Sequence, residues 1–162
     1  MPKLPPKTAL VVALALAALV VGCASTPAPT PRPPSAFVMP TDLPNGRVEI
    51  TIAPLYSLGV TATIPVAIVA TRGTITGPVA ARVLASGVND PGVPAEVLVR
   101  DLTVAPLSVT ANTRRSTTLT WDTRDMKGAI VPADAYSLVL EFRSDDLGTS
   151  RTVMASVTLE LR

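Results

Sequence analysis

Few side chains in this chain of 162 residues are capable of chemistry. There is no histidine, which removes the common general base, the Ser-His-Asp arrangement and most zinc sites. Cys23 is the single cysteine, and Lys127 is the only lysine apart from Lys3 and Lys7. Lys127 lies in a polar segment beside Asp125, which is typical of a solvated turn charge. The sequence therefore predicts a protein that is not an enzyme.

The carboxylates form a second group to consider, because Ca²⁺ takes about six to eight oxygen ligands. Asp122 and Asp125 lie close together in the sequence, as do Asp145 and Asp146. Neither pair has the alternating acidic spacing that presents three ligands from one loop. Basic residues also interleave with the first pair, so ion pairing is the simpler interpretation. We expect no bound metal and no cofactor.

The candidate residues for nucleic-acid binding are Arg114 and Arg115, which form a small basic spot. Recognition of nucleic acid would need a broader basic face and stacking groups, but the chain has only one Trp, two Tyr and two Phe. We interpret the two arginines as loop charge and expect no nucleic-acid partner.

Cys23 stands between an apolar run and a proline-rich stretch. Lys3 and Lys7 precede a run of about 13 apolar residues, which is shorter than the ~20 that span a bilayer. The small residue Gly22 comes directly before the cysteine. This order is typical of an export signal. The segment Val20-Val21-Gly22-Cys23 resembles the bacterial lipobox.

The lipobox resemblance implies that residues 1–22 are a signal peptide recognised through Val20, Val21 and Gly22. In that family the peptide is cut before the cysteine, whose thiol carries diacylglycerol and whose new amine is often acylated, as with palmitate. Two or three acyl chains give stable anchoring. A lipidated Cys23 leaves no thiol for a disulfide, so the exported domain must be stabilised by its core alone.

The same resemblance bears on charge and localisation. Loss of Lys3 and Lys7 takes the 14 basic residues to 12, equal to the 12 acidic ones, so the net charge of +2 describes only the precursor. Ala24 directly follows the cysteine, at the position where an aspartate would signal retention. In this respect the chain resembles lipoproteins that are sent to the outer membrane of diderm bacteria. In a monoderm the protein would stay on the outer face of the cytoplasmic membrane. Either way we expect a membrane-anchored protein of the cell envelope.

Residues 23–45 are rich in proline and poor in large apolar side chains. Proline fixes φ and removes amide donors, so this stretch is predicted to be a disordered, extended tether at ~3.1 Å per residue. A Pro-rich ligand for an aromatic groove is the alternative interpretation. The tether would hold the following domain, residues 46–162, clear of the lipid headgroups.

From residue 46 onward, apolar and polar residues alternate, and Val, Thr and Ile are frequent. This is the pattern of short β-strands. Pro65 indicates an edge position or a bulge in one of them. The composition of residues 145–148 predicts a hairpin loop. The predicted strands are Val48–Ile52, Val60–Ala70, Val79–Leu84, Val97–Val104, Thr118–Asp122, Tyr136–Arg143 and Thr152–Arg162.

About 115 residues with about seven strands and no convincing amphipathic helix suit a single all-β domain. We predict an Ig-like antiparallel β-sandwich. A small closed barrel is the alternative, since alternation does not distinguish two packed sheets from one closed sheet.

The segment from Trp121 to Tyr136 carries a more specific pattern. It resembles a recurrent signature of bacterial Ig-like domains, found in the flagellar hook-capping protein and in a family of bacterial intracellular proteinase inhibitors. The match is without a gap and includes Trp121, Asp122, Arg124, Asp125, Gly128, Val131, Pro132, Ala133 and Tyr136. The chain departs from the signature at Thr123 and Asp134, both usually glycine, and at Met126-Lys127, usually Asp or Asn.

The signature implies a structural role for each of these positions. Trp121 is expected to end a strand and cap the core, and residues 125–128 to form a polar turn. Tyr136 is expected to form a tyrosine corner, with its hydroxyl bonded to backbone a few residues upstream. The loss of glycine at position 134 is tolerable if Asp134 adopts the left-handed conformation, which Asp accepts more readily than most residues.

Two functions from different classes follow. The first is a non-catalytic binding or structural module that contacts an envelope protein or polymer through sheet edges or loops. The second, implied by the inhibitor resemblance, is a protease inhibitor that acts through an exposed loop. An exposed apolar patch or unpaired edge strand would favour the first function, and a rigid, extended, protruding loop would favour the second.

Overall fold

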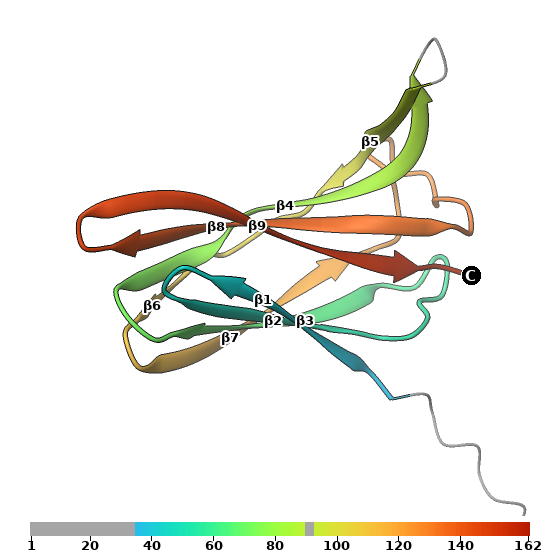
Figure 1. The fold of residues 1–162 in the computed structure, drawn as a ribbon. Coiled ribbons are helices and arrows are strands. Elements are labelled where there is room, and N and C mark those ends of the chain that lie inside the picture. Colours follow the sequence, from blue (N-terminus) through green and yellow to red (C-terminus); the bar gives the residue numbers. More distant parts are fainter. Residues whose placement is uncertain (1–34, 90–92) are drawn as a thin grey trace, which may run out of the picture. The chain divides into compact units, whose positions relative to one another are not determined.

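The computed structural model describes residues 35–89 and 93–162, which belong to one compact unit. The predicted signal peptide and Cys23 lie outside the described residues, as does the predicted tether up to residue 34. The described part contains strands and no helix, and the strands lie in two layers (Figure 1). The strands are β1 (Phe37–Leu43), β2 (Gly46–Ile52), β3 (Ala62–Ala70), β4 (Thr74–Asn89), β5 (Val93–Asp101), β6 (Leu107–Thr110), β7 (Thr113–Trp121), β8 (Ala135–Asp146) and β9 (Thr149–Glu160).

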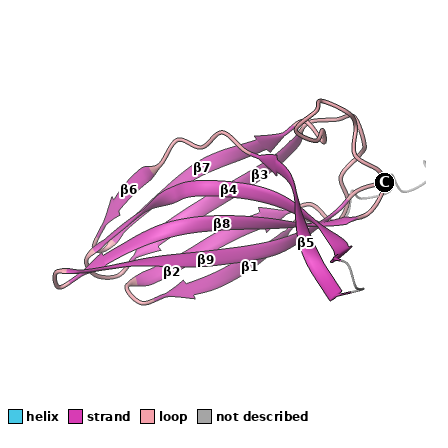
Figure 2. Ribbon diagram, turned by 90° about the horizontal axis from the view of Figure 1, so that it is seen from above, coloured by secondary structure: helices cyan, strands magenta, loops and turns pink. Residues whose placement is uncertain are grey.

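One sheet has the strand order β1-β2-β3-β7. The other has the order β5-β4-β8-β9, with β6 paired to the first part of β4. Every pairing between these strands is antiparallel (Figure 2). The predicted antiparallel sandwich is therefore confirmed, and the alternative of one closed barrel is wrong, because the strands form two separate sheets.

The topology also fits the predicted Ig-like class. Counted from β2 and leaving out β6, which pairs with β4, the strands take the places A, B, C, C′, E, F and G of an immunoglobulin-like sandwich. One sheet then contains A-B-E and the other contains C′-C-F-G. Strand β1 is an addition at the outer edge of A.

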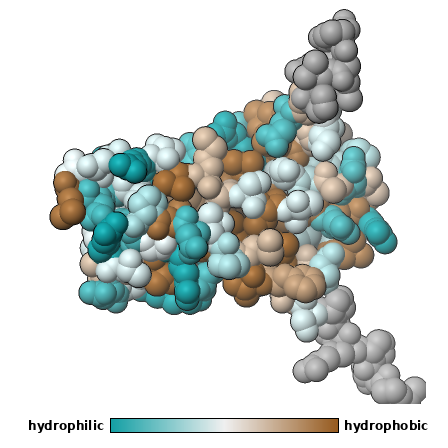
Figure 3. Space-filling view, viewed as in Figure 1, coloured by the Kyte–Doolittle hydropathy of each residue, from teal (hydrophilic) through white to brown (hydrophobic). Residues whose placement is uncertain are grey.

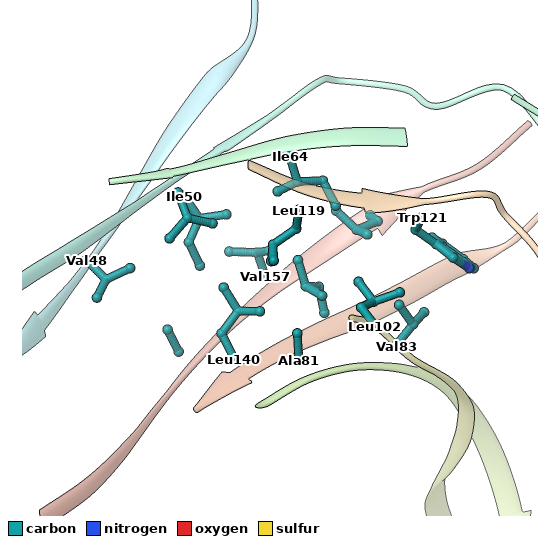
Figure 4. Close-up of a cluster of buried hydrophobic side chains, with 14 of the residues drawn as sticks. Val48, Ile50, Ile64, Ala81, Val83, Leu102, Leu119, Trp121, Leu140 and Val157 are labelled. Atoms are coloured by element: carbon teal, nitrogen blue, oxygen red, sulfur yellow. The ribbon is translucent and has the colours of Figure 1, made fainter. Parts of the chain in front are cut away.

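The core fills the space between the two sheets, and side-chain alternation supplies it. In β3, Ile64, Val66 and Ile68 are fully buried, while Thr63 and Pro65 are exposed. In strand β8, the alternating residues Leu138, Leu140 and Phe142 are likewise fully buried. Figure 4 shows such side chains from both sheets meeting in one cluster. Because successive residues of a strand point to opposite faces, the alternation read from the sequence sets which face becomes the core.

Two strands were missed by the sequence prediction, and one of them corrects a domain boundary. Strand β1 lies within residues 23–45, so the prediction of a tether extending to Asn45 is wrong for residues 37–45. Pro40 is compatible with β1 because the strand pairs only with β2 and forms the edge of its sheet. Strand β6 has only four residues and gives little periodicity.

Pro65 lies in β3, an interior strand of its sheet, but at a position that is locally an edge. Toward β7 it pairs with Thr118, whereas the ladder with β2 ends one residue later, at the pair Ile50 and Val66. Proline removes a donor from a ladder, and here no neighbouring strand needs that donor. The predicted hairpin loop is confirmed too. It consists of Leu147 (φ 48°) and Gly148 (φ 80°), and positive φ at both positions is typical of a type I′ turn.

Asn45 joins the two sheets with a buried amide. Its side chain is fully buried. Nδ2 donates to the Thr74 carbonyl at 3.0 Å, and Oδ1 accepts from the Ser144 hydroxyl at 2.6 Å. Its backbone carbonyl accepts from the amide of Thr71 at 2.8 Å. A residue predicted to belong to the tether is thus the polar link at one end of the sandwich.

We expect Asn45→Ala to lower the free energy of unfolding by about 1–3 kcal/mol, because it leaves buried polar groups without partners. Urea denaturation measures the change. Ser144→Ala is the matched variant, and the double variant should cost less than the sum of the two single changes. Additive costs, or a loss under about 0.5 kcal/mol for Asn45→Ala, would contradict the proposed link.

Candidate functional site

Trp121 ends strand β7 and closes one end of the core, as predicted from the signature. Its side chain is 1% exposed, and its Nε1 donates to the Arg124 carbonyl at 3.0 Å. The indole meets the ring of Tyr136 edge-on, with centroids 5.5 Å apart and an interplanar angle of 70°. This geometry suits the opposite charges of a ring's face and edge.

Tyr136 forms the expected tyrosine corner. It is the second residue of β8, and its hydroxyl donates to the Pro132 carbonyl at 2.9 Å. Burial of the ring raises the pKa of this phenol, and the nearby Asp134 carboxylate raises it further. The hydroxyl therefore stays protonated, and the corner stays closed, across the ordinary pH range.

The expected polar turn at residues 125–128 is also confirmed. Oδ1 of Asp125 accepts from the backbone amides of Lys127 and Ala129, both at 2.9 Å. Gly128 has a φ of 82°, which suits glycine. Arg124 and Ile130 form an antiparallel bridge at the base of the turn. We call residues 124–130 the small hairpin.

The two missing glycines of the signature behave differently from the prediction. Asp134 does not adopt the left-handed conformation, so the condition stated for the loss of that glycine is not met. Thr123 does, with a φ of 55°, although its branched side chain disfavours this. The Thr123 hydroxyl accepts from the Gly59 amide at 2.8 Å and donates to the Asp122 carbonyl at 2.7 Å. These bonds hold a buried threonine where glycine is usual.

The small hairpin packs against the free edge of β5. The Met126 amide donates to the Val99 carbonyl at 3.0 Å, and Nη1 of Arg100 donates to the Asp125 carbonyl at 2.7 Å. A groove of about 350 Å³ lies between the hairpin and the sheet. It is lined by Ala85, Leu98, Val99, Asp125, Met126, Lys127, Ile130, Val131, Pro132 and Tyr136.

The groove is apolar and open to solvent. Met126 is 61% exposed and Ile130 is 50% exposed, both on the small hairpin. Leu98 is 37% exposed on β5. Large apolar side chains that gather on the surface in this way mark binding sites more often than isolated ones do. We call this surface the hairpin groove.

The polar groups at the rim of the hairpin groove have structural partners. The carboxylate of Asp125 holds the turn through the two amides described above. Lys127 is exposed on the turn, as predicted. The arrangement offers apolar contact and a mixed charged rim, and the groove positions no nucleophile beside a base.

The other predicted residues are dispersed. Asp145 and Asp146 lie at the end of β8, next to the β8–β9 turn, and hydrogen bonds from Ser150 and Arg143 lower the pKa of the Asp145 carboxyl. Asp122 instead accepts from the Arg124 amide at 3.2 Å, in the segment after β7. Among the described residues, no group of three or more His, Cys, Asp or Glu is placed to hold a metal ion.

Arg114 and Arg115 lie in strand β7, so their interpretation as loop charge is wrong. They precede the apolar part of the strand, and their segment Thr113–Thr118 gave no apolar alternation to read. Nη2 of Arg114 forms an ion pair with Oε2 of Glu49 at 2.9 Å. The pair is a cross-strand contact on the outer face of the sheet.

Sequence reasoning did not find the hairpin groove, although one signal pointed to it. Met126 stands at a position where the signature usually has Asp or Asn, inside a turn that is otherwise polar. In the sequence, Met126 is visible only as a departure from the signature. Strand β5 contributes to the hairpin groove only because the small hairpin packs against it. Residue spacing in the sequence does not reveal this packing.

No protein-family model matches the sequence, and no curated protein matches it either. In the described residues, no helix is long and apolar enough to cross a membrane.

We expect Tyr136→Phe to cost about 1–2 kcal/mol of unfolding free energy at neutral pH, because the Pro132 carbonyl loses its donor. Folding raises the pKa of the phenol. Its contribution is therefore complete below the unfolded pKa of about 10 and is lost as the pH rises through the folded pKa. Urea unfolding at pH 8 and pH 11 should show a shallower alkaline loss in the variant.

Tyr56→Phe is a comparison variant that should behave in the same way. Burial also raises the pKa of Tyr56, and its hydroxyl accepts from the Ala53 amide at 3.0 Å. Each variant should remove part of the alkaline loss. An unchanged pH dependence in Tyr136→Phe would contradict the role given to its burial.

Proposed function

We propose that this chain is a lipid-anchored protein of the bacterial cell envelope whose β-sandwich is a non-catalytic binding module for another envelope protein. The order of Lys3, Lys7, the apolar run and Gly22 before Cys23 supports the anchor. The hairpin groove supports the binding role and is the observation that carries it. Its exposed Met126 and Ile130 have no reason to face water in an isolated domain.

The chemistry of the groove favours binding over catalysis. Met126, Ile130 and Leu98 supply apolar area, and methionine adapts to irregular partner surfaces. The one carboxylate in the lining already accepts two backbone hydrogen bonds. A partner would therefore gain affinity by covering apolar side chains within a polar rim, which is the usual anatomy of a protein interface.

The local architecture makes the groove a rigid platform. The small hairpin is held by its own turn bonds and by two further bonds to β5. Trp121 and Tyr136 fix the chain on either side of it. A preformed surface loses little conformational entropy when it binds, so the exposed side chains can contribute most of their area.

The groove can be tested by crosslinking in the native cells. A photo-crosslinking residue at Lys127, on the exposed rim, should capture one main envelope protein. We expect Met126→Asp and Ile130→Asp each to reduce that product at least ~10-fold, because a charge in a buried apolar contact is costly. Leu147→Asp is the control, because Leu147 is 95% exposed on the β8–β9 turn, away from the groove.

Equal capture by Met126→Asp and by the unchanged protein would overturn the role of the groove. Capture of a protease, with loss of its activity on addition of the protein, would favour the inhibitor function instead. Melting temperatures of all three variants should stay close to that of the unchanged protein, because the substituted side chains are exposed.

The anchor has a separate test. We expect Cys23→Ala to leave an unlipidated precursor that retains residues 1–22, because the thiol is the site of lipid attachment in proteins with a lipobox. Mass spectrometry of the membrane fraction measures both the cleavage and the lipid. Normally acylated, cleaved protein in this variant would show that Cys23 is not the attachment site.

A further inference from the structure

Strand β9 offers a long and regular free edge. It pairs with β8 over twelve consecutive residues, from Thr149 to Glu160, without a bulge. In the part of the chain that the structure describes, no strand pairs with its other side. The strand contains no proline, and its only charged residues are Arg151 and Glu160. Natural sheets usually protect such edges with prolines, charges or bulges.

The edges of β1, β7 and β5 carry such protection. Strand β1 has Pro40 and Asp42 within seven residues. Strand β7 begins with Arg114 and Arg115. The edge of β5 is partly covered by the small hairpin, through the bond to the Val99 carbonyl. The edge of β9 therefore differs in this respect from the edges of β1, β5 and β7.

The hydrogen bonds at the end of β9 show which of its backbone groups point outward. The Glu160 carbonyl accepts from the Tyr56 amide at 2.9 Å, on the side away from β8. The Leu161 amide donates to the Asp134 carbonyl at 3.0 Å, on the side of β8. Because backbone groups alternate along a strand, the outward residues are Ser150, Thr152, Met154, Ser156 and Thr158.

An apolar face lies uncovered beside this edge. Phe37 and Met39 of β1 are 58% and 45% exposed. They share a face with Ile50, because Met39 is directly paired with it, yet Ile50 is fully buried. Farther along β1, on the same face, Leu43 is only 7% exposed. The inner face of β1 is thus covered at one end and bare at the other.

The bare face and the free edge are neighbours. Strand β9 is the strand of the opposite sheet that β1 approaches. Figure 3 shows apolar side chains gathered on this face of the molecule, in the region of β9 and β1. One side of the sandwich therefore presents unpaired backbone groups next to inward-facing apolar side chains.

We propose that this edge binds an extended β-strand of a partner protein, which pairs with β9 and covers Phe37 and Met39 with alternating apolar side chains. The free backbone groups of β9 need donors and acceptors at the spacing of a strand, and the face of β1 needs apolar cover. A single added strand supplies both. The inference depends neither on the lipid anchor nor on the hairpin groove.

A second copy of the chain fits this edge less well than a lone strand. Pairing of β9 with β9 about a two-fold axis would bring the partner's β1 over this copy's β9. That space is already taken by β1 and β2 of the same copy. Of these two occupants, a strand donated by a different protein therefore fits the edge better.

The test uses the full chain in its native cells. A benzoylphenylalanine is placed in turn at Thr152, Met154, Ser156 and Thr158, whose side chains are all exposed. Crosslinked peptides are then mapped by mass spectrometry. A paired strand predicts one partner segment in which the crosslinked residue shifts by about two, always in one direction, as the probe moves by two.

The matched variants are Ser156→Pro and Ser156→Thr. Proline removes one outward amide and leaves the ladder to β8 intact, so the product captured from position 152 should fall at least ~10-fold. Threonine keeps the amide and should leave the yield unchanged. Thr158→Pro removes a second outward amide, and it replaces Ser156→Pro if that variant has a lowered melting temperature.

Scattered crosslinks, none at all, or a yield that both proline variants leave unchanged would overturn the proposal. A main product that joins two copies of this chain, with twice its mass, would also overturn it, in favour of a homodimer. Met126→Asp should not affect this product, so failure here and failure of the hairpin groove are distinguishable.

Discussion

The structure depends on one constraint, the alternation of inward and outward side chains held in register across both sheets. The only cysteine is Cys23, so no disulfide can form within the chain, and the sandwich depends on its apolar layer. That layer is continuous from Val48 on one sheet to Leu159 on the other. A shift of one residue in any central strand would turn its apolar side chains to water and its polar ones to the core.

The two ends of the sandwich are closed by polar contacts that the alternation does not supply. At one end, the Asn45 amide links Thr74 and Ser144. At the other, Trp121 and Tyr136 close the core and donate to backbone carbonyls of the connecting segment. In each case a buried donor finds a carbonyl of the connecting backbone, so chain turns that leave regular pairing still satisfy their polar groups.

A structural feature could be predicted from the sequence when the residues that cause it lie close together in the chain. The strands with strong alternation, such as Tyr136–Arg143, were predicted because the pattern lies within a few residues. Strand β1 was missed because Pro40 and Pro44 resemble a tether, and only pairing with β2 shows that an edge strand tolerates them. The left-handed conformation was considered at Asp134 and not at Thr123, because the bond of the Thr123 hydroxyl to Gly59 is a long-range contact. The hairpin groove was missed for the same reason.

The positions that fix the fold are separate in this chain from the exposed apolar positions for which we propose a binding role. The signature residues Trp121, Asp125 and Tyr136 use their polar groups in caps and turns, so they explain the architecture. Met126 is a departure from the signature, and Phe37 precedes the signature altogether, yet both are more than half exposed. A partner that covered either side chain would remove apolar area that the isolated domain leaves in water. Specificity in this domain is thus to be sought where the sequence stops following the pattern that folds it.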